Sequence, residues 1–154
     1  MSDKKDVAGV IAFPPLIFGV PLIAGLIADR LLSDERLPKP LQPLSAGFFA
    51  AAGALIVPAL VEFRKSNTAL DPYEETTAIL EHGPFAYTRN PVYLALTFAY
   101  VGISLAARSR LPLRLLPAVL FVVRTGVIER EERYLKRKFP ESYPKYFDRV
   151  PRWL

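Results

Sequence analysis

Cysteine is absent from the 154-residue sequence, and histidine occurs only once, as His82. Without cysteine, the chain forms no disulfide, offers no thiolate to a metal and has no thiol nucleophile. A single histidine likewise excludes a metal site made of several imidazoles. The composition therefore predicts a protein without a metal centre.

Charged residues are scarce within four long stretches, although they make up 23% of the whole sequence and hydrophobic residues make up 51%. A helix needs about 20 predominantly apolar residues to cross a bilayer core. The chain length fits one domain, which we assign to residues 1–154. We expect an all-α integral membrane protein with about four transmembrane helices, over residues 7–28, 44–61, 91–107 and 113–128.

The last two apolar stretches are separated only by a short basic turn, residues 108–112, which predicts a hairpin. Residues 115–128 of the fourth stretch would span about 21 Å at about 1.5 Å per residue, less than a hydrocarbon core of about 30 Å. We therefore expect the fourth span to be short. The charged residues that follow predict a cytoplasmic C-terminal helix over residues 129–139, which Pro140 ends.

The distribution of Lys and Arg predicts the orientation in the membrane. With four spans, both termini and the loop from Arg64 to Arg89 share one side, which carries 13 of the 20 cations, and the other side carries 6. We expect the side with more cations to be cytoplasmic. Because the charges flank apolar stretches, the net charge of +5 indicates membrane lipids as the partner and argues against nucleic acid.

The segment of residues 83–93 reads G-P-F-A-Y-T-R-N-P-V-Y and combines turn signals with aromatic residues and one cation. Gly83-Pro84 and Asn90-Pro91 both indicate turns. Proline is well tolerated in the first turn of a helix, so Asn90 is a candidate N-cap of the third span. Composition alone is equally compatible with an ordinary interfacial connection whose Arg and Tyr residues lie among lipid headgroups.

Two further motifs accompany this segment. The run Glu131-Glu132-Arg133-Tyr134-Leu135 precedes Phe139, Tyr143, Tyr146, Val150 and Arg152, and residues 67–72 read N-T-A-L-D-P. Together the motifs resemble those of the isoprenylcysteine carboxyl methyltransferase and phospholipid methyltransferase superfamily. The superfamily patterns are G-P-Y-x-x-x-R-H/N-P-x-Y, then E-E-x-x-L with F-G, Y-x-x-Y and V-x-R, and a weaker G-T-x-x-x-P. The resemblance covers more than half of the chain and implies a small membrane enzyme that uses S-adenosylmethionine.

The sequence departs from the superfamily patterns at three positions. Asn90 stands where many relatives have histidine, Phe85 where tyrosine is common, and Pro140 where glycine is common. Asparagine occurs in bacterial-type members, so the resemblance implies a bacterial-type inner membrane. With the orientation predicted from Lys and Arg, the motifs and the active site fall on its cytoplasmic side. The departures leave the methyl acceptor open.

The resemblance implies a catalytic role for Arg89 and Glu132 and a cofactor site that draws on both main motifs. We expect the residues that bind S-adenosylmethionine to be Tyr87, Arg89, Asn90, Pro91, Tyr93, Leu94, Glu131 and Glu132. Spacing does not decide which of the two glutamates faces the cofactor, because adjacent helical residues point about 100° apart. Without the resemblance, the glutamate pair would be taken for a solvated face of a charged helix.

Four residues are candidates for binding the methyl acceptor: Arg124, Tyr146, Arg149 and Arg152. A charge near the end of a span is costly and usually faces a partner or a cavity, and Glu131 lies seven residues after Arg124 on the same helical face. Alternatively, Arg124 extends to the membrane interface. The other two arginines could hold an anionic headgroup or contact the membrane surface, and Tyr146 could equally be an interfacial anchor.

The leading functional hypothesis is methyl transfer from S-adenosylmethionine to a lipophilic substrate at the membrane, as in an isoprenylcysteine carboxyl methyltransferase. One alternative is a membrane sterol or steroid reductase that uses NADPH, since these enzymes carry a similar R-H-P-x-Y signature. They are generally longer, and Asn90 fits their signature less well. A second alternative is a non-catalytic membrane protein that retains the fold. The sequence does not predict an oligomeric state.

Overall fold

The computed structural model describes residues 7–32 and 36–154, and within these ranges it contains helices, turns and loops but no strand. This confirms the expected all-α class. The elements follow one another as α1 (Pro14–Leu32), η1 (Lys39–Leu41), α2 (Leu44–Lys65), η2 (Gly83–Ala86), α3 (Pro91–Ala106), α4 (Leu111–Val123), the π-helical turn η3 (Arg124–Ile128), α5 (Glu129–Lys138) and α6 (Tyr143–Arg149).

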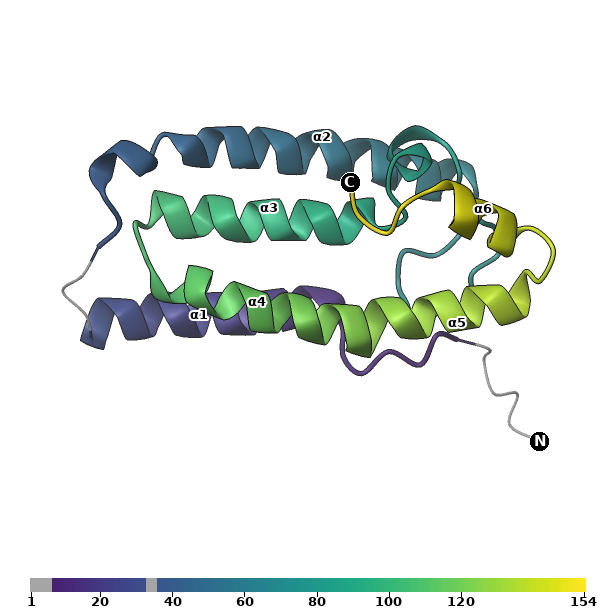
Figure 1. The fold of residues 1–154 in the computed structure, drawn as a ribbon, viewed down its shortest axis with the longest axis horizontal. Helices are drawn as coiled ribbons and strands as arrows, with labels where there is room; N and C mark the ends of the chain where they lie inside the picture. Colours follow the sequence, from purple (N-terminus) through teal and green to yellow (C-terminus); the bar gives the residue numbers. More distant parts are fainter. Residues whose placement is uncertain (1–6, 33–35) are drawn as a thin grey trace.

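The long helices run side by side, with α2 along α3 and α1 beside α4 (Figure 1). Helix α3 also packs on α1 and contacts α4, so it lies at the centre of the bundle. A buried cluster joins α1, α3 and the α4–η3 helix: Phe18, Leu22, Tyr93, Tyr100, Val119, Val123, Val127 and Ile128. The expected hairpin of the last two spans is formed by α3 and α4.

Within the described residues, three helices are long and apolar enough to cross a membrane: Pro14–Leu32, Lys39–Lys65 and Leu111–Lys138. The fourth span runs directly into the expected charged helix, so that α4, η3 and α5 form one continuous helix of 28 residues, about 42 Å long at about 1.5 Å per residue. Helix α3, expected as a full span over residues 91–107, is a short apolar helix whose 16 residues extend about 24 Å. It therefore falls short of a hydrocarbon core of about 30 Å.

The first helix begins later than the expected residue 7. Proline suits the first turn of a helix, so Pro14 begins α1, and only Pro21 lies inside it. The preceding segment instead packs across the π-helical turn, where the Ile11 amide donates a hydrogen bond to the Gly126 carbonyl at 3.2 Å. A β-carbon at residue 126 would meet the end of the Ile11 side chain, which would have to shift to make room for it.

The α3–α4 turn lies at one end of the bundle. There the buried carboxylate of Asp29 joins α1 to the α3–α4 hairpin. Its Oδ2 accepts hydrogen bonds from the Ser109 hydroxyl and from the backbone amides of Arg110 and Leu111, at 2.5, 2.6 and 3.2 Å. These amides begin α4, where a helix has free N–H groups. These three donors replace water around one carboxylate oxygen of this buried residue near the end of α1.

The opposite end of the bundle is more irregular. It gathers the loop of residues 66–82, η2, α5, α6 and the C-terminal tail around the start of α3 (Figure 1). All of the motifs recognised in the sequence lie in these segments, which places the candidate site at this end.

The orientation stays a prediction, and the lack of native cysteine makes it simple to test with single cysteines. Ser142 precedes α6 at the site end, and Ala107 lies in the α3–α4 turn at the other end; both are exposed. The Ala107→Cys variant should react with an impermeant maleimide added to intact cells, whereas Ser142→Cys should react only after the membrane is permeabilised. The reverse pattern would show the opposite orientation. Ser109, in the same turn, is buried and unsuitable.

Candidate functional site

A cavity of about 390 Å³ lies at the irregular end of the bundle. Pockets for small molecules have volumes of about 300–1,000 Å³. The wall is mostly apolar, and a few polar side chains converge on one part of it. Its residues come from the segment before α1, from α2, from the loop of residues 66–82, and from α3, α5 and α6.

Arg89 carries the buried positive charge of the cavity. Its side chain is 9% exposed, and its Cζ lies 3.7 Å from the centre of the Phe147 ring, which Lys136 also contacts. Nη1 is 3.2 Å from Glu132 Oε1, close enough for an ion pair. Nevertheless, Nε and Nη1 of Arg89 are the buried side-chain atoms without a hydrogen-bond partner in the described part of the chain. Such atoms are costly unless a ligand or water satisfies them, so Arg89 is suited to bind an anionic group.

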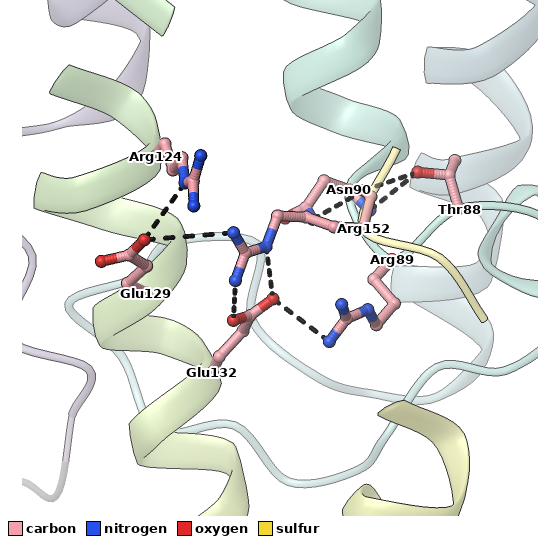
Figure 2. Close-up of polar contacts among 7 residues, drawn as sticks. All are labelled: Thr88, Arg89, Asn90, Arg124, Glu129, Glu132 and Arg152. Atoms are coloured by element: carbon pink, nitrogen blue, oxygen red, sulfur yellow. Dashed lines mark hydrogen bonds and ion pairs between the residues drawn. The ribbon is translucent and has the colours of Figure 1, made fainter. Parts of the chain in front are cut away.

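Glu132 lies between two arginines (Figure 2). Arg152 binds it through two hydrogen bonds, Nε to Oε1 at 3.0 Å and Nη2 to Oε2 at 2.7 Å, while Arg89 approaches from the other side. The network continues outward from Arg152 to Glu129 at 4.0 Å and from Glu129 to Arg124 at 3.2 Å. Both oxygens of Glu132 are thus engaged by protein groups.

Glu131 has a different environment from its neighbour. Its Oε1 accepts a hydrogen bond of 2.7 Å from the Tyr93 hydroxyl, which comes from the first turns of α3. Within residues 7–32 and 36–154, no ion pair joins Glu131 to a cation, whereas Glu132 is paired twice. Both glutamates line the cavity. Among the described residues, Glu131 is therefore the cavity glutamate that has no cationic partner and can meet a cationic group of a ligand.

Two tyrosines of α6 complete the polar part of the wall. The Tyr146 hydroxyl donates a hydrogen bond of 2.8 Å to the Phe85 carbonyl, which docks α6 against η2. Burial, with a contribution from the negative charge of Glu132, raises the pKa of Tyr143 to about 12. The hydroxyl of Tyr143 therefore stays protonated at neutral pH and can donate a hydrogen bond into the cavity.

The C-terminal tail is fastened to the segment of residues 83–93. The Arg152 carbonyl accepts hydrogen bonds from Thr88 Oγ1 and from Asn90 Nδ2, both at 3.0 Å, and the Arg89 amide donates to the Pro151 carbonyl at 2.9 Å. Asn90 occupies the N-cap position of α3, as expected, but its side chain does not cap the helix. Instead it binds the tail.

The loop of residues 66–82 covers another part of the cavity. Asn67 has a φ of 47°, in the left-handed region that asparagine tolerates better than most residues. The turn that follows is held by hydrogen bonds between Thr77 and Thr68 and between Thr77 and the Asn67 carbonyl, both at 3.0 Å. This conformation turns residues 68–72 toward the cavity.

The structure brings most of the expected site residues together and places the others elsewhere. Arg89, Asn90, Pro91, Tyr93, Glu131, Glu132 and Tyr146 line the cavity, whereas Tyr87, Leu94, Arg124, Arg149 and Arg152 do not. Tyr87 is 72% exposed and lies on the surface, so the structure gives it no place in a cofactor wall.

The arginines expected to bind the acceptor are engaged by protein carboxylates. The side chain of Arg124 is 58% exposed and pairs with Glu129, on the outer side of the helix. Arg149 pairs with Glu81 at the surface, and Arg152 pairs with Glu132. Arg124 does not share a face with Glu131, because the π-helical turn between them changes the rotation per residue.

Sequence reasoning missed the contribution of the loop and of Tyr143. Residues 68–72, Thr76 and residues 78–80 line the cavity, as does Tyr143. A signal for the loop was present in the weaker N-T-A-L-D-P match, but it was not carried over to the site. Tyr143 belongs to the recognised Y-x-x-Y pattern, where an interfacial anchor was an equally good interpretation.

The comparisons with known proteins agree with this placement of the motifs. A family model described as phospholipid methyltransferase matches residues 42–142. This range contains α2, the loop, the segment of residues 83–93 and both cavity glutamates. No curated protein and no solved structure matches the chain.

The hydrogen bond between Tyr93 and Glu131 can be tested by removing one hydroxyl group. We predict that Tyr93→Phe lowers the free energy of unfolding in detergent by about 1–3 kcal/mol, because it leaves a buried carboxylate without its donor. The matched control is Tyr87→Phe, whose ring is exposed and whose stability should stay at the wild-type value. Equal stability of the two variants would show that the Tyr93 hydroxyl has no such role.

Proposed function

The chain belongs to the phospholipid methyltransferase family, and from this premise we propose that it transfers a methyl group from S-adenosylmethionine to a lipophilic acceptor in the membrane. The single observation that carries the proposal is a cavity lined by both the buried, incompletely hydrogen-bonded guanidinium of Arg89 and the carboxylate of Glu131, which has no ion pair among the described residues.

The residues of the cavity fit the cofactor by charge and polarity. The amino-acid end of S-adenosylmethionine carries a carboxylate and an ammonium group, which Arg89 and Glu131 would bind respectively. Tyr143 would add a hydrogen bond, and the apolar and aromatic residues Phe63, Leu80 and Phe85 offer a surface for the adenine ring. Glu132 would hold Arg89 in place, because its own oxygens are already engaged.

For methyl transfer, the protein mainly has to align the two reactants and exclude water from them. S-adenosylmethionine would supply a methyl group bonded to a sulfonium sulfur: the nucleophile of the acceptor would bond to the methyl carbon as the carbon–sulfur bond breaks and a neutral thioether leaves. The chain contributes a cavity whose polar side chains lie at one part of the wall and whose remainder is apolar. Arg89 and Glu131 fix the orientation of the reactants in this cavity.

The acceptor would reach the cavity from the bilayer. Phe13, Pro14 and Pro15 at the start of α1 and Ile56 and Leu60 of α2 form an apolar part of the wall. Helix α1 packs on α3 and α4, and α2 packs on α3. The region between α1 and α2, rather than the surroundings of Arg124, is therefore the candidate path for a lipid tail.

The nucleophile of the acceptor determines whether a base is needed. A carboxylate acceptor, as in an isoprenylcysteine carboxyl methyltransferase, attacks without losing a proton. An amine acceptor must be neutral when it attacks, and Glu131 is placed in the cavity where it could accept that proton. The scarcity of histidine favours the carboxylate, while the family description favours a phospholipid amine. In either case we place the reaction on the cytoplasmic side of a bacterial-type inner membrane.

Cofactor binding separates the methyltransferase from a reductase that uses NADPH and from a non-catalytic protein. We predict that calorimetry in detergent detects binding of S-adenosylmethionine and not of NADPH. Arg89→Gln should weaken this binding at least tenfold, about 1.4 kcal/mol, because it removes the buried positive charge. The control is Arg64→Gln, which removes an exposed cation at the end of α2 and should bind like the wild type. Binding of NADPH alone, or of neither compound, would reject the proposal.

The path of the acceptor is tested by filling the apolar part of the cavity. We predict that Leu60→Trp reduces methylation of lipid acceptors at least tenfold while the affinity for S-adenosylmethionine changes less than twofold. The control is Val57→Trp on the same helix, since Val57 is 61% exposed and lies outside the cavity. The assay measures transfer of a labelled methyl group to a lipid extract and to prenylcysteine analogues. A parallel loss of cofactor binding in Leu60→Trp would contradict this path.

A further inference from the structure

The carboxy-terminal Arg152 is engaged at both ends by the protein. Its carbonyl accepts two hydrogen bonds from Thr88 and Asn90, and its guanidinium forms two parallel hydrogen bonds with Glu132 (Figure 2). It does not line the cavity. The residue therefore links the start of α3 to α5 from a position outside the lining of the cavity.

The pairing of Glu132 determines the state of Arg89. A carboxylate and a guanidinium form their strongest contact as a bidentate pair, and here Arg152 holds Glu132 in that manner. Arg89 has only a single close approach to Glu132, and Nε and Nη1 of Arg89 have no hydrogen-bond partner. Two arginines thus compete for one carboxylate, and the arginine that lines the cavity is the one left incompletely satisfied.

We propose that Arg152 is a positioning residue: by holding Glu132 in a bidentate pair, it keeps Arg89 available to the anionic group of the ligand. Without Arg152, the buried Glu132 would lose its better partner, and an unpaired buried carboxylate is costly. Glu132 would then turn to Arg89 and form the bidentate pair there. The cavity would lose its positive group even though Arg89 itself is unchanged. The inference rests on the proposed function for the identity of the ligand.

The first test measures cofactor affinity by calorimetry in detergent. Arg152→Gln should bind S-adenosylmethionine at least tenfold more weakly than the wild type. Arg152→Lys should show a smaller loss, because an ammonium keeps the charge but lacks the planar fork of the guanidinium. The control is Arg133→Gln, which removes an exposed cation from the same helix as Glu132 and should keep wild-type affinity. Wild-type affinity in Arg152→Gln would overturn the inference.

A double variant shows whether Arg152 acts through Glu132. Glu132→Gln removes the carboxylate that would capture Arg89, so Arg152→Gln should add no further loss of affinity in that background. Losses that multiply in the double variant would mean that Arg152 contacts the ligand directly, which overturns the positioning role.

Trp153, the single tryptophan of the chain, packs against the buried cluster and reports whether the tail stays docked. We expect its emission maximum to be unchanged in Arg152→Gln; a red shift would attribute the affinity loss to detachment of the tail instead.

The last test needs no ligand and so separates this inference from the proposed function. The melting temperatures of Arg89→Gln, Glu132→Gln and the variant with both changes measure the coupling between Arg89 and Glu132. If Glu132 turns to Arg89 when Arg152 is absent, this coupling should be larger in the Arg152→Gln background than in the wild-type background. Equal coupling between Arg89 and Glu132 with and without Arg152 would overturn the inference. Larger coupling without Arg152, together with no binding of S-adenosylmethionine by the wild type, would reject the proposed function but support the positioning role of Arg152.

Discussion

Glu132 is a buried negative charge, and three segments distant in the sequence meet because that charge must be compensated. It lies on α5, Arg89 precedes α3, and Arg152 belongs to the C-terminal tail. Burying a carboxylate is favourable only when good ion pairs and hydrogen bonds replace its water. The pairing therefore fixes the tail against the start of α3 and the start of α3 against α5. The cavity exists between these segments, so its polar side depends on the same contact.

The π-helical turn explains why the charges of the last helix divide between the cavity and the surface. In a regular α-helix, residues seven apart share a face, which would place Arg124 with Glu131. A π-helical turn has i→i+5 hydrogen bonds and changes this phase. The cavity consequently receives the two glutamates, while Arg124 pairs with Glu129 outside. The same turn presents the Gly126 carbonyl to Ile11, which brings the segment before α1 to the cavity.

The sequence predicted the apolar helices because the length of an apolar stretch is a local property. It predicted that the two main motifs meet because the hairpin of the last two spans returns the chain to the same end of the bundle. It could not predict the π-helical turn, since nothing in R-T-G-V-I distinguishes it from an α-helical turn, and the assignment of Arg124 failed for this reason. The choice between the adjacent Glu131 and Glu132 likewise depended on tertiary partners. Arg152 was expected to bind the acceptor, but its partner in the structure is the carboxylate of Glu132. An ion pair between residues distant in the sequence, such as Arg152 and Glu132, produces no periodic pattern from which it could be predicted.

The short central helix α3 determines how deep in the membrane the candidate site would lie. The hairpin end is fixed by Asp29, whose carboxylate binds the first turn of α4. At the other end, α3 begins at Pro91 and extends only about 24 Å, less than a hydrocarbon core of about 30 Å. With the hairpin turn at one membrane surface, the start of α3 and the adjacent Arg89 would lie near the opposite boundary of the core and not far out in the aqueous phase. Charges at that depth are tolerated because they pair with one another around Glu132. Under the proposed function, a lipid acceptor could then meet a water-soluble cofactor without leaving the bilayer.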